Sequence, residues 1–295
     1  MYRIAHISDL HLRAENENKH LDLFLALLND IKSKKCDHLV ITGDISDTSD
    51  PGDFKIFTGI LKKNNFYNPE KLSVTIGNHD IFGGAKKGQS VFLFPSDSKN
   101  VDYFLKVHQF NKYFQTTSDN NNYRCKIDYS LNLKFLAGNI VLISINSIAM
   151  WSANKNPISS NGFISSKNIK RIKKLLDNED LEKKIKIVLI HHHFKEPRNN
   201  ELNNPHSLWL YSERNTMKLH HKERILKLFD KYEINFILHG HTHITESYNI
   251  NGRTFLNSSG CIMPFTDDRK LQYYILNIPE KAIRSDNITF RKITL

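Results

Sequence analysis

Apolar residues in the first eighty positions recur in two alternating patterns. Short, continuous apolar runs are typical of buried strands, and each is followed by a polar or glycine-containing segment: residues 2–8, 38–42 and 72–76. Between these runs the apolar residues recur at helical spacing, over 21–31 and 54–63. Asp50-Pro51 is a typical opening for the second helix. This alternation predicts parallel strands joined by right-handed crossovers.

The regular alternation ends after the third strand. Residues 81–122 are rich in Phe and Tyr and predict a loop-like insertion, which either covers a sheet edge or forms a rim over a site. A second, polar insertion is predicted at 194–218 within a single domain spanning residues 1–295. Asn251-Gly252 is a strong hairpin signal. Further strands are predicted at 125–130, 133–136, 140–145, 186–190, 236–238, 244–250, 254–258, 273–277 and 288–293, and helices at 165–176 and 219–232.

The charge balance favours a solvated surface over a dedicated face for polyanions. The 295 residues include 42 Lys plus Arg and 31 Asp plus Glu, which gives a net charge of +11. The basic residues are spread along the chain instead of forming one block. A nucleic-acid partner therefore stays open but is not favoured, and a chain of this length can bury a full core.

Cysteine usage and the absence of long apolar runs favour a cytoplasmic protein. Cys36, Cys125 and Cys261 are odd in number and widely spaced, which argues against a disulfide framework and suits a reducing compartment. The N-terminus becomes polar too early for a signal-peptide core. No apolar run approaches the ~20 residues that a membrane span needs.

Polar clusters follow five of the strand-like runs. They are Asp9-Leu10-His11, Gly43-Asp44, Gly77-Asn78-His79-Asp80, His191-His192-His193 and Gly240-His241-Thr242-His243. Each alone is also compatible with a turn. Because the carboxyl ends of adjacent strands meet in one crevice, however, we expect these side chains to converge. Two carboxylates, an amide and four imidazoles are too many for one tetrahedral ion and suit two ions, with Mn, Fe, Zn or Co favoured over Ca or Cu(I).

The order of these motifs resembles the calcineurin-like metallophosphoesterase superfamily. The family pattern is D-x-H, G-D-x-x-D, G-N-H-D/E, H and G-H-x-H, and all five parts occur between Asp9 and His243. The spacing is most similar to the compact bacterial class III cyclic-nucleotide phosphodiesterase branch. The resemblance implies a four-layer αββα sandwich of the α/β class, with two mixed sheets flanked by helices. It also implies an enzyme, a metal-dependent phosphoric ester hydrolase.

The same resemblance implies a ligand set for two divalent or trivalent metal ions, Mn, Fe or Zn. One ion would be held by Asp9, His11, Asp44 and His243. The other would be held by Asp44, Asn78, His191 and His241, so that Asp44 bridges them. The choice between His191 and His192 stays open. Relatives usually carry a proline soon after this position, whereas here Phe194 follows and Pro197 comes later, which puts the adjoining loop in question.

The implied chemistry is in-line attack on a small phosphodiester, such as a cyclic nucleotide, by a metal-bridging hydroxide. Two divalent ions, two carboxylates and the hydroxide leave a centre of about +1, which attracts phosphate. His79 would give a proton to the leaving oxygen, and Asp47 would orient His79 unless it merely caps a helix. Asp80 would be a turn residue, and Gly240 would let the backbone turn sharply. The expected substrate contacts are Asn78, Arg198, Trp209 and the segment 82–94.

Three alternatives share the same motifs. A DNA nuclease of the double-strand-break-repair type would suit the net charge, but the chain lacks room for that family's capping region and coiled coils. A phosphomonoesterase is the second, although Thr48 after Asp47 and Asp80 in the third motif argue against a protein phosphatase. The third is a non-catalytic scaffold on the same fold, which is disfavoured because every ligand position is filled.

Overall fold

The structure is a computed structural model of the chain. It describes residues 1–14, 18–84, 97–114, 131–137, 139–178, 181–195, 218–259, 261–262, 270–280 and 287–295.

The first sheet combines parallel strands from the start of the chain with antiparallel strands from its end. Its order is β13-β12-β1-β2-β3. The strands are β1 (Tyr2–Ile7), β2 (His38–Ile41), β3 (Leu72–Val74), β12 (Gln272–Ile278) and β13 (Thr289–Thr294). β1, β2 and β3 are parallel, as predicted, whereas β12 is antiparallel to both β1 and β13. The carboxyl ends of β1, β2 and β3 therefore meet at one edge.

The second sheet has the order β10-β11-β9-β7-β5-β4. Its strands are β4 (Leu131–Leu136), β5 (Ile140–Ile145), β7 (Ile185–Ile190), β9 (Phe236–His239), β10 (Thr245–Ile250) and β11 (Arg253–Ser258). The four central strands are parallel. The predicted hairpin at Asn251-Gly252 joins β10 to β11, with φ of 50° and 80° at these two residues. β4 pairs with β5, while its predicted partner at 125–130 lies outside the described residues.

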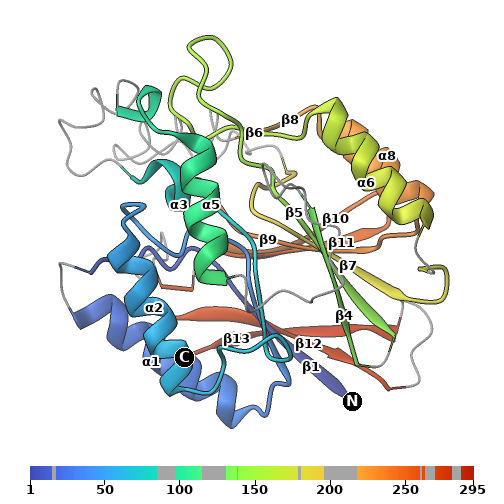
Figure 1. Cartoon of the computed structure of the whole chain (residues 1–295). Helices are drawn as coiled ribbons and strands as arrows, with labels where there is room; N and C mark the ends of the chain where they lie inside the picture. The colour runs from blue at the N-terminus through green and yellow to red at the C-terminus, as the bar shows by residue number, and fades with distance from the viewer. Residues whose placement is uncertain are drawn as a thin grey trace, which may run out of the picture.

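Helices cover the outer faces of both sheets and complete a four-layer αββα sandwich, as predicted. They are α1 (Asn18–Ser33), α2 (Pro51–Lys63), α3 (His79–Phe82), α5 (Tyr103–Phe114), α6 (Ser166–Asn178) and α8 (Lys222–Lys231). Figure 1 shows α1 and α2 on one side of the two sheets and α6 and α8 on the other. Three hydrophobic cores fill the spaces between these layers, one of them between the two sheets. The sheets are thus buried on both faces, which explains their continuous apolar runs.

Local sequence signals account for several helix ends. Asp50 caps α2 by accepting a hydrogen bond from Gly52 N, and Pro51 is the first helical residue. Ser165 Oγ accepts from Asn168 N at 3.1 Å at the start of α6. The predicted helix over 219–232 begins later, because 219–220 form the short strand β8 (Leu219–His220) beside β6 (Gly162–Phe163). His221 then takes a left-handed conformation with φ of 56° directly before α8.

The prediction of a loop over 81–122 was wrong where the structure describes it. Residues 79–82 and 103–114 are helical. The missed signal in α5 is the helical spacing of its buried residues, Tyr103, Val107, Phe110 and Phe114. Phe110 and Phe114 pack against Phe54 of α2 with ring centroids 5.7 and 6.1 Å apart. The predicted aromatic packing is therefore present, while residues 85–96 and 115–122 lie outside the described part.

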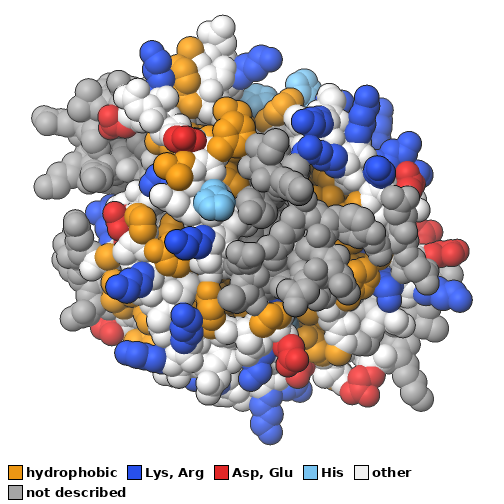
Figure 2. Space-filling view, in the orientation of Figure 1, with side chains coloured by type: hydrophobic (Ala, Val, Ile, Leu, Met, Phe, Trp, Pro, Cys, Tyr) orange, Lys and Arg blue, Asp and Glu red, His pale blue; other side chains and the backbone are white. Residues whose placement is uncertain are grey.

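The surface charges, the helix lengths and the cysteines complete the description of the fold. Figure 2 shows Lys and Arg side chains spread over the visible face, with Asp and Glu among them. Within the described ranges, no helix is long and apolar enough to span a bilayer. Cys36 and Cys261 carry free thiols, and Cys125 lies outside the described residues.

Phe57 tests the packing between α2 and its neighbours. It is fully buried, with its ring stacked on Phe24 at 5.2 Å and edge-on to Phe114 at 5.8 Å. Phe57→Ala should lower the free energy of unfolding by about 3–5 kcal/mol, measured by denaturant unfolding. The matched control is Phe104→Ala, since Phe104 is 43% exposed on α5 and should cost well under half as much. Equal losses in the two variants would contradict this packing.

Candidate metal centre

The clusters predicted at strand ends converge at one edge of the sandwich. Asp9 and His11 follow β1, Asp44 follows β2, and Asn78 precedes α3, all from the first sheet. His191 follows β7, and His241 and His243 follow β9, from the second sheet. Backbone hydrogen bonds connect neighbouring loops: Asp9 N donates to Gly43 O, and Gly240 N donates to His191 O, both at 3.0 Å. The site therefore lies across both sheets.

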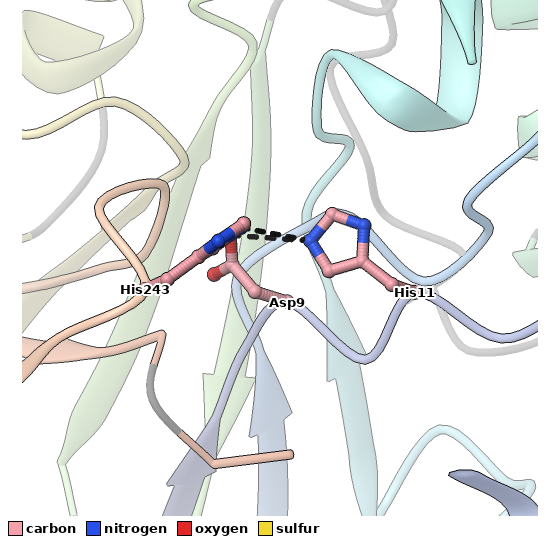
Figure 3. Close-up of side chains that lie close together, drawn as sticks. All are labelled: Asp9, His11 and His243. Atoms are coloured by element: carbon pink, nitrogen blue, oxygen red, sulfur yellow. Dashed lines mark hydrogen bonds and ion pairs between the residues drawn. The ribbon is translucent and has the colours of Figure 1, made fainter. Parts of the chain in front are cut away.

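One group of ligand-type atoms comprises Asp9, His11 and His243. Figure 3 shows the three side chains pointing toward one another. The Nε2 atoms of His11 and His243 are 3.0 Å apart. Asp9 Oδ1 lies 3.6 Å from His243 Nε2 and 3.9 Å from His11 Nε2. The Asp9 carboxylate is held in place because both its oxygens accept from His241 N, at 3.1 and 3.0 Å.

A second group comprises Asp44, His191 and His241, with Asn78 beside it. His191 Nε2 lies 3.0 Å from His241 Nδ1, 3.0 Å from Asn78 Oδ1 and 3.3 Å from Asp44 Oδ2. The other ring nitrogen of His191, Nδ1, donates to Thr42 O at 2.8 Å. That hydrogen bond fixes the ring so that Nε2 faces the group and can offer a lone pair to an ion that displaces its proton.

Asp44 connects the two groups. Its Oδ2 lies 3.3 Å from His191 Nε2 in one group and 3.9 Å from His11 Nε2 in the other. Its Oδ1 accepts from His79 N at 2.9 Å, which fixes the carboxylate. Asp44 is almost completely buried. One carboxylate is thus placed to serve two adjacent ions.

The structure places His191, and not His192, in this group. Both ring nitrogens of His192 are engaged elsewhere: Nδ1 with Ser147 Oγ at 2.7 Å and Nε2 with Ser160 O at 3.1 Å. The His192 ring lies against that of His241, with centroids 4.4 Å apart. His192 therefore supports the ring of a neighbour instead of offering a ligand atom.

Five of the seven candidate ligands have left-handed backbone conformations, which non-glycine residues seldom adopt. The φ angles are 55° at Asp9, 45° at His11, 51° at Asp44, 84° at His241 and 53° at His243. Such conformations cost of order 1–3 kcal/mol each and cluster at functional sites. These conformations lower the stability of the fold, but they orient the ligand side chains toward one another.

Two motif glycines are required because other atoms approach them closely. A Cβ on Gly77 would lie 2.1 Å from Asp44 Oδ1, and a Cβ on Gly240 would lie 2.1 Å from Ser8 Oγ and 2.3 Å from Asp9 Oδ2. Gly240 has no positive φ. A left-handed conformation is therefore not what requires glycine here; the missing side chain lets the two sheets approach each other at Asp9.

Asp47 contacts two imidazoles through one oxygen. Its Oδ1 lies 3.3 Å from Nδ1 of His11 and 3.3 Å from Nδ1 of His79. Its Oδ2 accepts from Nε and Nη2 of Arg13, a residue that the sequence analysis did not single out. Burial opposes ionisation, but the hydrogen bonds from His11 and His79 hold the pKa of Asp47 well below its usual range. The helix-cap alternative for Asp47 was wrong, since Asp50 caps α2.

Asp80 proves to be more than a turn residue. The carboxylate is fully buried and accepts from Ile45 N at 2.9 Å, Ser46 N at 3.0 Å and Gly77 N at 2.8 Å. It therefore fastens the loop that carries Asp44 to the loop that carries Asn78. Burial and the nearby Asp44 charge raise the pKa of Asp80 to about 7. The available signal was the fourth position of the Gly-Asn-His-Asp motif.

Burial and mutual charge strongly perturb the remaining groups. Burial raises the pKa of Asp9 to about 6. Burial alone would lower the pKa of His191, but the Asp44 carboxylate raises it to about 9. Burial, together with neighbouring imidazoles, lowers the pKa values of His241 and His243 well below the usual range. A cation would have to displace the proton of His191. The affinity of the site for the cation should therefore fall as the pH is lowered.

The chemistry of the donors fits a pair of metal ions. Imidazole nitrogens face one another at 3.0 Å in each group, and carboxylates lie beside them at 3.3 to 3.9 Å. Without an ion each close pair of nitrogens needs a shared proton, and a metal ion can replace that proton and bind the surrounding donors. The expected substrate contacts Arg198 and Trp209 lie outside the described residues, as does most of the segment 82–94, of which Phe82 is buried.

Gly77 tests the tight packing around Asp44. Gly77→Ala should reduce the affinity for Mn²⁺ at least about tenfold, because the new methyl group displaces the Asp44 carboxylate. Binding of Mn²⁺ to the metal-free protein can be measured by calorimetry. Gly59→Ala is the control, since a Cβ at this α2 position meets nothing within 4 Å, and it should leave the affinity unchanged. Unchanged affinity in both variants would contradict the close approach.

Comparisons with known proteins agree with the geometry. Residues 2–245 match the family model described as calcineurin-like phosphoesterase. A dimetal phosphatase from Danio rerio has a similar structure, with a TM-score of 0.61, 11% identity and coverage of 99% of this chain and 98% of that one. So does a purple acid phosphatase from yellow lupin (Lupinus luteus) seeds, with a TM-score of 0.58, 15% identity and coverage of 93% and 49%.

No curated protein matches the chain in sequence. The two structural similarities, at such low identity, concern the fold. The family model, by contrast, spans most of the chain. The structure also contains the clusters of His and Asp expected for this family. The chain belongs to the calcineurin-like phosphoesterase family and is a metallophosphoesterase.

Proposed function

We propose that the protein hydrolyses a small phosphodiester, with a cyclic nucleotide as the leading candidate, and that it acts in the cytoplasm. The observation that carries the proposal is the position of Asp44 between two groups of ligand atoms, with the His79 imidazole at their edge. Asp44 Oδ1 accepts from the backbone of His79 itself. The bridging carboxylate and the proposed proton donor are therefore positioned by one short segment.

In this proposal Asp9, His11, Asp44 and His243 hold one ion, and Asp44, Asn78, His191 and His241 hold the other. The mixture of imidazole, carboxylate and amide donors, without thiolate, suits Mn, Fe or Zn. The ions, when bound, polarise the phosphoryl oxygens and make hydroxide available at neutral pH. Asn78 would also be near the substrate, since it lies between His191 and the start of α3.

His79 gives the leaving oxygen its proton. Its Nδ1 faces the Asp47 carboxylate at 3.3 Å, which leaves Nε2 at the opposite end of the ring for the substrate. The His79 side chain is 17% exposed, close to the 14% of the proposed ligand His243, whereas His191 and His241 are buried. A proton donor needs such exposure to meet a substrate.

The Arg13 guanidinium beside the site is already engaged by a carboxylate of the protein. Within the described ranges, Arg13 is the one Arg or Lys side chain that bonds a residue of the site, and both of its bonds go to Asp47. It therefore neutralises a carboxylate of the protein. A monoester dianion carries one more negative charge than a diester and gains more from an additional cation. The relatives of similar fold are named as phosphatases, so monoester hydrolysis is the comparison that any test must include.

A nuclease activity is supported less well. The basic side chains visible in Figure 2 are dispersed among acidic ones and do not outline one path. The scaffold alternative is disfavoured because the ligand-type side chains of both groups are present and converge. The nuclease alternative predicts cleavage of DNA, and the scaffold alternative predicts no activity and no bound metal.

A substrate panel tests the proposed function. With added Mn²⁺, a bis-aryl phosphodiester and 3′,5′- or 2′,3′-cyclic nucleotides should be hydrolysed at least about tenfold faster than an aryl monoester or single-stranded DNA. Asp44→Asn should lower all activities at least about a hundredfold, because it weakens both ion sites together. A preference for the monoester would overturn the diester proposal. Near-normal activity of Asp44→Asn would overturn the two-ion arrangement.

His79→Asn tests the proton donor. The variant should bind Mn²⁺ with unchanged affinity, since the two proposed ligand sets do not include His79, although its imidazole lies close to His11 and Asp44. Turnover of a cyclic nucleotide, whose alkoxide leaves poorly, should fall about 10²–10⁴-fold, whereas turnover of an activated aryl diester should fall far less. Steady-state kinetics on both substrates provides the measurement. Equal losses on the two substrates would show that His79 does not protonate the leaving group.

A further inference from the structure

Asp47 is held between Arg13 on one side and two imidazoles on the other. Nε and Nη2 of Arg13 both donate to Asp47 Oδ2. Oδ1 remains, and it lies 3.3 Å from Nδ1 of His11 and 3.3 Å from Nδ1 of His79. The two rings meet edge to face with centroids 4.6 Å apart. One carboxylate oxygen is therefore shared by a residue of the first ion site and by the proposed proton donor.

The backbone holds Arg13 and Asp47 in register. Leu12 N donates to Ile45 O at 2.8 Å, and Asp47 N donates to Leu12 O at 3.1 Å. The buried Asp53 side chain of α2 accepts from Ala14 N at 2.6 Å and from Ser46 Oγ at 2.5 Å. These contacts join the residues that flank Arg13 to those that flank Asp47. The ion pair is thus built into the fold and is not a chance encounter of two surface side chains.

A carboxylate with only imidazole partners could rotate and give one oxygen to each ring. Two donors from Arg13 on Oδ2 prevent this, because rotation would break both bonds. With Oδ1 fixed, the Nδ1 atoms of both rings lie 3.3 Å from the same oxygen. The Nε2 atom of His11 is then aimed at His243 Nε2, 3.0 Å away, and that of His79 is aimed away from Asp47.

We infer that Arg13 is a positioning residue which, by holding Asp47, sets the orientation of His11 and His79 together. The inference rests on the proposed function, since it assigns one imidazole to an ion and the other to the leaving group. Arg13 itself need not touch the substrate. Its side chain is about one-third exposed, so a direct substrate contact is the competing explanation that the test must separate.

The test compares Arg13→Gln, Arg13→Lys, Asp47→Asn and the double variant Arg13→Gln/Asp47→Asn. Arg13→Gln removes the charge and the paired donors, and Arg13→Lys keeps the charge but loses the planar pair. Arg224→Gln is the control for loss of one positive charge, because Arg224 is exposed on α8 and donates to Ser166 Oγ. Mn²⁺ affinity of the metal-free proteins, kcat and KM on a cyclic nucleotide and on an aryl diester, and thermal unfolding are measured for each.

Arg13→Gln should lower Mn²⁺ affinity about tenfold, through His11, and lower kcat on the cyclic nucleotide about 10–100-fold, through His79. The loss on the aryl diester should be smaller, and KM should stay unchanged. Arg13→Lys should recover only part of both losses. In the Asp47→Asn background, Arg13→Gln should add nothing, because Arg13 acts through Asp47. Arg224→Gln should behave as the unaltered protein.

Other outcomes overturn the inference. Independent, additive losses in the double variant would mean that Arg13 acts without Asp47. A rise in KM with unchanged kcat and Mn²⁺ affinity would assign Arg13 to the substrate. A lower unfolding temperature with normal affinity and kinetics would make the pair purely structural. If His79→Asn itself proves insensitive to the leaving group, the proposed proton donor fails, while the Mn²⁺ affinities still decide whether Arg13 positions His11.

Discussion

The buried carboxylate of Asp44 is the constraint on which the rest of the site depends. It must reach ligand atoms from two sheets, so both sheets must end at the same place and approach within a few ångströms. His79 N holds one of its oxygens, and Gly77 leaves room for that oxygen by having no side chain. The glycines and polar residues that look like turn signals in the sequence are therefore the space and the donors that a buried carboxylate requires.

Buried hydrogen bonds hold the strained loops of the site in place. Left-handed residues such as Asp9, Asp44 and His241 would relax if their loops were free. Asp80 holds one pair of these loops, and Asp53 joins Ala14 to Ser46 and Thr48. Neither carboxylate faces the proposed substrate. They act as supports, and the sharp convergence of the ligand atoms is the result.

The sequence allowed the layers of the fold and the convergence of the clusters to be predicted, because both follow from local patterns. Continuous apolar runs mark strands buried on both faces, and parallel strands bring their carboxyl ends together. The helix α5 was missed because its apolar residues, such as Phe110 and Phe114, were interpreted as loop aromatics without counting their spacing. The choice of His191 could not be made from three identical neighbours. Thr42 O, Ser147 Oγ and Ser160 O, all remote in the chain, distinguish the rings of His191 and His192.

Arg13 and Asp80 illustrate a more general limit. Their partners, Asp47 for one and the backbone of Ile45 and Gly77 for the other, depend on how two loops lie side by side, and no periodicity encodes this. Gly240 differs from these two residues, since its place in the motif was recognised from the sequence but the close approach of other atoms to it was not. The need for a residue without a side chain becomes visible only when the atoms of Ser8 and Asp9 are placed next to it. The roles of the ligand residues, of His79 and of Asp47 stay predictions.

The division of the ligands between the two sheets has a consequence for the life of the protein in a cell. Asp9, His11, Asp44 and Asn78 come from one sheet, and His191, His241 and His243 come from the other. A chain in which only one half has folded offers an incomplete set of donors and cannot retain a pair of ions. If the predicted ligands hold ions, metal loading would require both sheets to have folded and docked.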